Sequence, residues 1–341
     1  MYPIKPSRLL SLNHLLLFLG FLSFSPLIVA NEEGRWQKLE FTSPSPGPLE
    51  GLSGLARITP PRHNAAYSFL GVLDNRNSDE PRTVMINLDS NFKVIGVIEL
   101  IWPTGYPDNL KDLESVAAVP NTLDLNQQFV ATTSSGRYWR FTINGIDQID
   151  NLLAGEGKLT LSGKNSSAEQ IESVAFFVNQ SSGNTKIVWS SRGSRDHSAR
   201  MFAADFVNSS SELSFNDSKK YYIEQDDVKW PRPKWSNDSQ TRLVSDLKIS
   251  NPEGTTYISS AFDGGDDGPF ASTLYEIGEF ISVSNFEDAQ KPYIPLTDLF
   301  IRGYGKKVEA IEFVGDSVSN GFILGTDDED IGSYIMVLKL P

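Results

Sequence analysis

The sequence reads LESVA at residues 113–117 and IESVA at residues 171–175, and this pair of segments decides the fold. Three further segments keep the same order of an acid or serine followed by a small apolar strand: LSGLA at 52–56, VSDL at 244–247 and VEAI at 308–311. The polar residue of each segment follows the previous one after 61, 58, 73 and 64 residues. Recurrence at such a period indicates a repeat architecture.

Each repeat has room for four strands with their turns. The first repeat predicts four strands, at Leu52–Ile58, Ala66–Leu73, Thr83–Leu88 and Lys93–Trp102. Four-stranded units arranged around an axis are the blades of a β-propeller. A β-sandwich or a pair of barrels would require no repeat of this length. The sequence therefore predicts an all-β chain folded as a β-propeller.

Five blades are expected, because no sixth unit is visible in residues 200–244 or 278–307. The fifth repeat holds three clear strands, of which Ser333–Leu340 is the last. Its missing outer strand can come from Arg35–Thr42. Pairing of the two ends of the chain would close the ring and remove an exposed sheet edge.

The N-terminus has the order of a secretory signal peptide. Lys5 and Arg8 precede the apolar run Leu15–Leu22, and small residues lead to Ala30. We therefore expect a signal peptide at residues 1–30, a single propeller domain at 31–341, and a secreted or periplasmic protein. An uncleaved membrane anchor is the alternative. The apolar run is short for a membrane span of ~20 residues, so no stable span is expected after cleavage.

Charge and cysteine content exclude some classes of partner and fold. The chain has a net charge of −13, which becomes −15 without Lys5 and Arg8. A surface this acidic argues against binding to a nucleic-acid polymer. The absence of cysteine excludes a disulfide scaffold, so stability must come from the core, the sheet ladders or a metal ion.

Propeller topology places one polar residue of each repeat at the mouth of the axial channel. These five residues are Ser53, Glu114, Glu172, Ser245 and Glu309. Carboxylates this close together repel one another unless they take up protons or bind a cation. Oxygen ligands around an axis suit Ca²⁺, which accepts irregular oxygen shells. The alternative is that the acids only accept hydrogen bonds from backbone at the strand starts.

The loops after the second strands form another ring on the same face. Its arginines are expected to bind substrate: Arg76, Arg137, Arg192 and Arg195. Its acids include the expected catalytic residues: Asp74, Asp327 and Asp328. Blades one to three would supply the positive side, and blades four and five the negative side. Arginine forks match phosphate or carboxylate oxygens, whereas acids can hold a metal or act as a general base. Solvated loops with exposed ion pairs are the alternative.

Two tryptophans lie in a long connection on the same face. Trp230 and Trp235 stand in the segment 226–241 with Arg232 and Lys234. Exposed tryptophan beside arginine suits a planar or sugar-like ligand. The alternative is that both rings pack the loop onto the propeller.

Several common catalytic arrangements are missing from the sequence. It contains no GxxxxGK[ST], HExxH or GxSxG motif. Only His63 and His197 remain after removal of residues 1–30. A histidine-rich metal site and a Ser-His-Asp hydrolase are therefore not expected.

The axial pattern resembles that of the secreted calcium-activated nucleotidases, or apyrases. That family is a five-bladed propeller whose axial calcium is held by Ser, Glu, Glu, Ser and Glu, one from each blade. The order matches Ser53, Glu114, Glu172, Ser245 and Glu309. The segment Asp74–Arg76 is similar to an Asp-Asp-Arg motif of the family, with Asn75 in place of the second acid. The strings ESVA and GTDDE also resemble phytase-like esterase propellers.

Both resemblances imply phosphorylated substrates. The expected function is hydrolysis of phosphate-containing small molecules by a calcium-dependent enzyme. Arg76, Arg192 and Arg195 would hold phosphate oxygens, and Asp74, or Asp327 with Asp328, would orient water. A non-catalytic propeller remains the alternative, in which calcium is structural and the face binds a protein or glycan.

Overall fold

The computed structural model describes most of the propeller and not the N-terminal segment. The described residues are 36–42, 46–77, 80–103, 110–120, 127–144, 148–150, 157–159, 170–179, 182–194, 199–206, 219–223, 240–265, 268–280, 297–298, 305–316 and 318–339. The predicted signal peptide at 1–30 lies outside them. Within the described part of the chain, no helix is long and apolar enough to cross a membrane.

The strands form five antiparallel sheets, which are the blades of a propeller. Blade 1 comprises β4 (Leu52–Ile58), β5 (Tyr67–Leu73), β6 (Thr83–Leu88) and β7 (Val94–Glu99). Blade 2 comprises β8 (Leu113–Ala118), β9 (Gln128–Thr133), β10 (Arg137–Asn144) and β11 (Gln148–Asp150), with β12 (Gly157–Lys158) beside β10. Blade 3 comprises β13 (Ile171–Val178), β14 (Thr185–Ser191), β15 (Ala199–Phe206) and β16 (Lys219–Ile223). The four strands predicted for the first repeat are therefore confirmed to within a few residues at their ends.

The remaining blades follow the same order from the inside outward. Blade 4 comprises β17 (Thr241–Ile249), β18 (Thr255–Asp263), β19 (Phe270–Glu279) and β20 (Thr297–Asp298). Blade 5 comprises β21 (Val308–Phe313), β22 (Phe322–Thr326), β23 (Tyr334–Leu338) and β1 (Gln37–Lys38). A small hairpin joins β2 (Glu40–Phe41) to β3 (Gly47–Pro48). Two 3₁₀ turns, η8 (Val318–Asn320) and η9 (Glu329–Ile331), flank β22.

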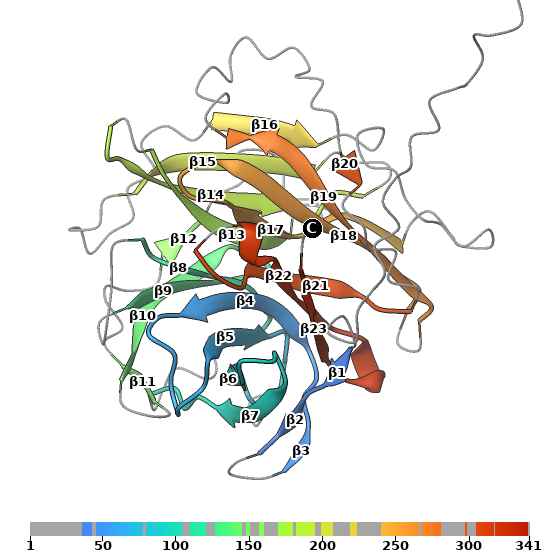
Figure 1. Ribbon diagram of the computed structural model, residues 1–341. Coiled ribbons are helices and arrows are strands. Elements are labelled where there is room, and N and C mark those ends of the chain that lie inside the picture. The colour runs from blue at the N-terminus through green and yellow to red at the C-terminus, as the bar shows by residue number, and fades with distance from the viewer. Residues whose placement is uncertain are drawn as a thin grey trace, which may run out of the picture.

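The ring closes through both its inner and its outer strands. The innermost strands touch in a cycle, in the order β4, β8, β13, β17, β21 and back to β4. At the outer edge of blade 5, β1 pairs with β23 at Gln37–Ile335 and Lys38–Tyr334, so the first and the last described strand lie side by side (Figure 1). The predicted five-bladed propeller and its closure by an N-terminal strand are confirmed. The closing pair satisfies the backbone of an edge that would otherwise be open.

Apolar side chains fill the spaces between neighbouring blades. Ala56 and Leu70 of blade 1, for example, share a buried cluster with Phe129 and Trp139 of blade 2. Close approach of the inner strands also needs small residues. A Cβ atom on Gly54 of β4 would lie 2.8 Å from the Cα atom of Ser115 on β8, which no neighbouring backbone can accommodate. Glycine at this point therefore sets the spacing of blades 1 and 2.

A β-bulge recurs near the start of each innermost strand. In four blades a single residue is left without a partner on the second strand: Ser53, Glu114, Glu172 and Glu309. In blade 4 the register jumps from Arg242 to Asp246, so the irregular stretch includes Ser245. A bulge turns the side chain of the unpaired residue away from the regular alternation of a strand. The repeated polar residues are thus the bulge residues of the five blades.

Asp246 lies on the axis below these bulges and joins four blades. Its carboxylate accepts hydrogen bonds from the backbone N–H of Leu247 at 2.8 Å and of Ile311 in blade 5 at 2.9 Å. The hydroxyl of Ser115 in blade 2 lies 3.4 Å from it and itself accepts the N–H of Val174 in blade 3 at 3.0 Å. Burial raises the pKa of Asp246 to about 7, and this rise is opposed by the charge of Lys248 and by the backbone donors.

The exchange Asp246→Ala is expected to lower the free energy of unfolding by about 3–5 kcal/mol, because it leaves two buried backbone N–H groups without their acceptor and the buried Lys248 ammonium without its carboxylate partner. Denaturant unfolding of the full chain measures this loss.

Asp205→Ala serves as the matched control, because Asp205 is exposed and makes only a surface ion pair with Lys186. Its effect should stay within about 1 kcal/mol. Equal losses in the two variants would contradict a central role for Asp246.

Candidate functional site

The bulge residues bring charged groups together at one mouth of the axial channel. Glu114, Glu172 and Glu309 are each at most 4% exposed. Arg242, at the start of β17, reaches the carboxylates of two other blades: its Nη1 atom contacts Glu309 and lies 4.0 Å from Glu172. The two serines of the predicted ring are also buried. Ser53 donates to the carbonyl of Gly51 at 3.2 Å, whereas the Ser245 hydroxyl has no hydrogen-bond partner among the described residues.

Two acids of the predicted calcium ring are already paired with cations. Arg192 donates from Nε to Glu172 at 2.6 Å. Arg242 pairs with Glu309 and, at 2.7 Å, with Asp263. Burial lowers the pKa of Arg242, but the charges of Glu309, Glu172 and Asp263 outweigh this and hold it well above its ordinary value. Arg242 therefore remains charged among the ring residues. Its positive charge offsets the negative charges of Glu172 in blade 3 and Glu309 in blade 5.

Lys307 is a second buried cation, just before β21. Its ammonium lies 2.9 Å from Asp327 and 3.7 Å from Glu309, and it also contacts Glu329. Asp327 further accepts the N–H of Gly51 at 3.1 Å, which joins blade 5 to blade 1. Burial raises the pKa of Glu309 to about 7, with Arg242 and Lys307 opposing the rise.

Asp328 is held by three donors. Its carboxylate accepts from Lys306 Nζ at 2.7 Å, from the N–H of Lys307 at 2.7 Å and from the Thr326 hydroxyl at 3.1 Å. Its side chain is fully buried. These contacts, like those of Asp327, fix the start of blade 5 and occupy the carboxylate oxygens that a general base would need.

The remaining acids gather on the blade 1 and blade 2 side. Carboxylate oxygens of Asp74, Asp112 and Glu114 lie within 4.8 Å of one another. One buried oxygen of Asp74 and one of Asp112 have no hydrogen-bond partner among the described residues. Burial, together with hydrogen bonding to and repulsion by Asp112, raises the pKa of Asp74 to about 9. Burial and repulsion by Glu172 and Asp74 raise the pKa of Glu114 as well. In both groups burial and neighbouring acids outweigh the opposing charges of Arg76 and Arg192.

Asp112 is a site residue that the sequence reading missed. Its backbone has a φ of 66°, and its N–H donates to the carbonyl of Asn75 at 3.2 Å. Its side chain accepts from the hydroxyl of Ser134. The left-handed backbone is uncommon outside glycine and asparagine or aspartate, and here it turns Asp112 towards blade 1.

The repeat itself contains a pattern that predicts Asp112 and Lys307 as site residues. Asp112 and Lys307 each stand two positions before a ring glutamate, as Gly51 stands two positions before Ser53. The carbonyl at this position accepts the N–H that follows the second strand in blades 1, 2, 3 and 5. Alignment of the repeats at this position would have placed both charged residues at the mouth. Arg242 pairs with Ala261 immediately before the longer irregular stretch of blade 4, where the alignment fails.

The expected substrate-binding arginines differ in exposure. Arg76 is 73% exposed, with Nη2 lying 3.3 Å from Asp112 and Nε 3.8 Å from Asp74. Arg192 is 24% exposed and is bound to Glu172. Arg137, at the start of β10, is exposed. Arg195, Trp230 and Trp235 lie outside the described residues.

Residues outside the loops change the charge distribution that the loops alone suggested. The buried cations Arg242 and Lys307 come from blades 4 and 5, whereas the acids with unpaired oxygens come from blades 1 and 2. The loops alone suggested arginines on blades 1 to 3 and acids on blades 4 and 5. The difference arises because Arg242 and Lys307 lie at the starts of inner strands, not in the loops that were compared.

No protein-family model matches the sequence, and a search of curated proteins finds no match. Among solved structures, an endo-1,4-beta-xylanase from Bacteroides thetaiotaomicron is 10% identical with a TM-score of 0.45, over 84% of this chain and 90% of that chain. An endo-arabinase from the same organism is 8% identical with a TM-score of 0.43, over 86% and 95%. Likeness at this level supplies no argument about the chemistry of this chain. The five-bladed fold rests on the strand pairing described above.

In the presence of a chelator, the free energy of unfolding is expected to fall as the pH rises from about 5 to about 9. The pKa values of Glu309, about 7, and Asp74, about 9, exceed their ordinary values of 4.5 and 3.8, so the folded state binds these protons more tightly than the unfolded state. The resulting stability is complete below the ordinary values and is lost through about pH 7 and then about pH 9. Urea unfolding across this range measures the slope.

Asp74→Asn should flatten the upper part of this profile, because the variant has no proton to lose there. Asp205→Asn, on an exposed outer position, should leave it unchanged. A profile that is flat or rises with pH in the unaltered chain would contradict the assignment.

Proposed function

We propose that this chain is a secreted or periplasmic hydrolase of phosphate-containing small molecules that depends on a bound Ca²⁺ ion. The observation that carries the proposal is the cluster of Asp74, Asp112 and Glu114, whose carboxylate oxygens lie within 4.8 Å of one another beside the exposed guanidinium of Arg76. A cation and an arginine side by side are a recurrent arrangement for holding phosphoryl oxygens.

The residues present fit a calcium ion at this cluster better than at the centre of the five-residue ring. Asp74 and Asp112 each offer a buried oxygen that lacks a hydrogen-bond donor among the described residues, and the one cation near these oxygens is Arg76, which is 73% exposed. Glu172 and Glu309 are instead paired with Arg192 and Arg242, whose positive charges oppose a second cation there. Ca²⁺ accepts irregular sets of carboxylate oxygens. We therefore propose Asp74, Asp112 and Glu114 as its protein ligands.

The ion and the charged residues around it would then have different roles. A bound Ca²⁺ would polarise a phosphoryl oxygen. Arg76 would bind another phosphoryl oxygen through its fork, which its exposed position leaves accessible. Asp74, besides serving as a ligand of the ion, would orient the attacking water as a hydrogen-bond acceptor. Asp327 and Asp328 would support blade 5, because lysine and backbone donors already occupy their oxygens.

A non-catalytic propeller with structural calcium is the second candidate. It is favoured by one specific feature, the position of the cluster across the seam between blades 1 and 2. Asp74 belongs to blade 1, and Asp112 precedes β8 of blade 2. A cation shared between them would tie the two blades together, with the face left to bind a protein or glycan.

Addition of Ca²⁺ to chelated protein is expected to raise the melting temperature, because ion binding to the folded state alone adds to its stability. Asp112→Asn should abolish most of this rise, and Mg²⁺ should give less, because it requires a more regular oxygen shell. Differential scanning calorimetry measures both. Asp205→Asn is the matched control and should keep the full rise. Absence of any rise in the unaltered chain would remove the calcium from the proposal.

The exchange Arg76→Gln distinguishes the two candidates. For an enzyme, loss of a charge-assisted contact to phosphate should lower kcat/KM for phosphate release from nucleotides by about 10- to 100-fold, without loss of the calcium-dependent rise in melting temperature. Arg137→Gln, on the same face but outside the cluster, is the control and should change turnover less. A calcium-dependent rise without release of phosphate from any nucleotide or phosphomonoester would favour the structural alternative.

A further inference from the structure

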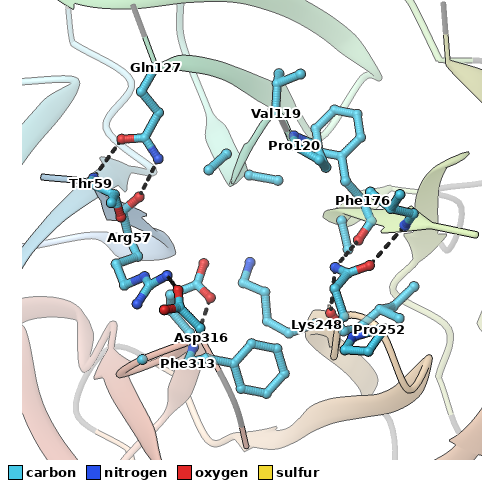
Figure 2. Close-up of a pocket in the computed structure, with 18 residues that line it drawn as sticks. Arg57, Thr59, Val119, Pro120, Gln127, Phe176, Lys248, Pro252, Phe313 and Asp316 are labelled. Carbon is cyan, nitrogen blue, oxygen red and sulfur yellow. Dashed lines mark hydrogen bonds and ion pairs between the residues drawn. The ribbon is translucent and has the colours of Figure 1, made fainter. Parts of the chain in front are cut away.

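The other end of the axial channel holds a cavity of about 480 Å³. It lies where the innermost strands end, whereas the carboxylate ring lies where they begin. Every blade contributes to its lining, for example through Arg57, Val119, Phe176, Lys248 and Phe313 (Figure 2). A cavity of this volume is large enough for a small organic ligand.

Two side-chain amides fix the walls of this cavity. Gln127 of blade 2 accepts the N–H of Thr59 at 2.7 Å and donates to the carbonyl of Arg57 at 3.0 Å, both in blade 1. Asn251 of blade 4 accepts the N–H of Val178 in blade 3 at 2.8 Å. Each amide therefore acts as a short bridge between neighbouring blades. The cavity is preformed, and its amides are occupied by backbone, which leaves recognition to its charged groups and its apolar walls.

Lys248 places a cation on the floor of the cavity. Its side chain is 5% exposed, and Figure 2 shows it reaching into the middle of the cavity. Its Nζ atom lies 3.3 Å from the carbonyl oxygen of Val116 and 3.3 Å from Asp246. The Nζ atom also lies 3.5 Å from the second oxygen of Asp246, so a ligand carboxylate would share the three N–H donors of the ammonium group with these partners.

Glu312 places an anion on the same lining. One of its oxygens accepts the N–H of Phe313 at 2.8 Å. Among the described residues no ion pair joins Glu312 to a cation within 4.0 Å, although Lys248 and Arg57 are near enough to act on its charge. Arg57 pairs instead with Asp316, which is 93% exposed at the rim. The cavity thus holds one positive and one negative group that are not paired with each other.

The walls between these groups are mainly apolar. Val119 and Pro120 of blade 2 and Phe176 of blade 3 stand on one side, and Pro252 of blade 4 on another (Figure 2). Such walls favour a ligand with an apolar body. A simple anion would face repulsion from Glu312, and a simple amine would face repulsion from Lys248 and Arg57. A ligand that carries both a carboxylate and an ammonium group can pair with Lys248 and with Glu312.

We propose that this cavity binds a small zwitterion with an apolar body, such as an apolar amino acid or dipeptide. Its carboxylate would accept from Lys248, its ammonium would donate to Glu312, and its side chains would pack against Phe176 and Val119. The site is separate from the carboxylate ring, so the proposal stands independently of any phosphate chemistry.

Isothermal titration of the full chain with L-leucine and with leucyl-leucine tests the proposal. We expect binding of at least one of them, with a dissociation constant on the order of 0.1 mM. The same titration with N-acetyl-leucyl-leucine and with leucyl-leucine amide removes one charge at a time. Each change should weaken binding at least about tenfold, as expected for the loss of a charged hydrogen bond. These probes require no altered protein.

Two variants test whether the ligand binds in this cavity. Glu312→Gln should remove the preference for the free ammonium group, and Lys248→Met should remove that for the free carboxylate. Lys93→Met and Glu253→Gln, both at exposed turns, are the matched controls and should bind like the unaltered chain. Equal affinity for the zwitterion and both capped forms, or absence of binding by all four probes, would overturn the proposal. Binding that survives both cavity variants would place the ligand elsewhere and would overturn it too.

Discussion

The bulge near the start of each innermost strand is the constraint on which the rest of this structure depends. A regular strand alternates its side chains between two faces, and in a propeller both faces are covered by neighbouring blades. The extra residue of a bulge breaks this alternation, and in blades 2, 3 and 5 it is a glutamate. Three buried carboxylates follow from one repeated backbone irregularity. Burying these carboxylates has an electrostatic cost, which the blades offset to different extents.

Blades 3 to 5 offset that cost with largely buried cations, whereas the acids of blades 1 and 2 have only the exposed Arg76 beside them. Arg242 and Lys307 come from residues beside the bulges of their own blades, so they approach Glu309 from both sides. Asp112 occupies the corresponding position in blade 2 and adds a negative charge to Asp74 and Glu114 instead. Because of this difference, the side of the ring formed by blades 3 to 5 is a network of ion pairs. The side formed by blades 1 and 2 is a candidate cation site. A symmetrical ring of five ligands would not have this division.

Asp246 separates the two ends of the axis. It ties blades 2, 4 and 5 together directly and reaches blade 3 through Ser115, so the middle of the channel is filled with hydrogen-bonded groups. Below it, Lys248 carries positive charge towards the second cavity. The two mouths therefore have different chemistry although the same five strands form both. The mouth where the inner strands begin gathers carboxylates. The cavity where they end combines apolar walls with Lys248 and Glu312, and the Arg57–Asp316 ion pair also lines it.

The sequence by itself determined the blades, their number, the closing strand and the repeated polar residue, because each depends on local pattern and on the spacing of the repeat. Glu114 and Glu172 could be placed near one axis for this reason. The sequence did not reveal that Arg242 neutralises Glu309, that Asp112 joins Asp74, or that Lys248 and Glu312 share a cavity. Those pairs are separated by tens of residues, and whether two charges are paired depends on side-chain approach across blades. Only the tertiary structure decided them, because charge compensation in a buried ring is a property of distances in space and not of order along the chain.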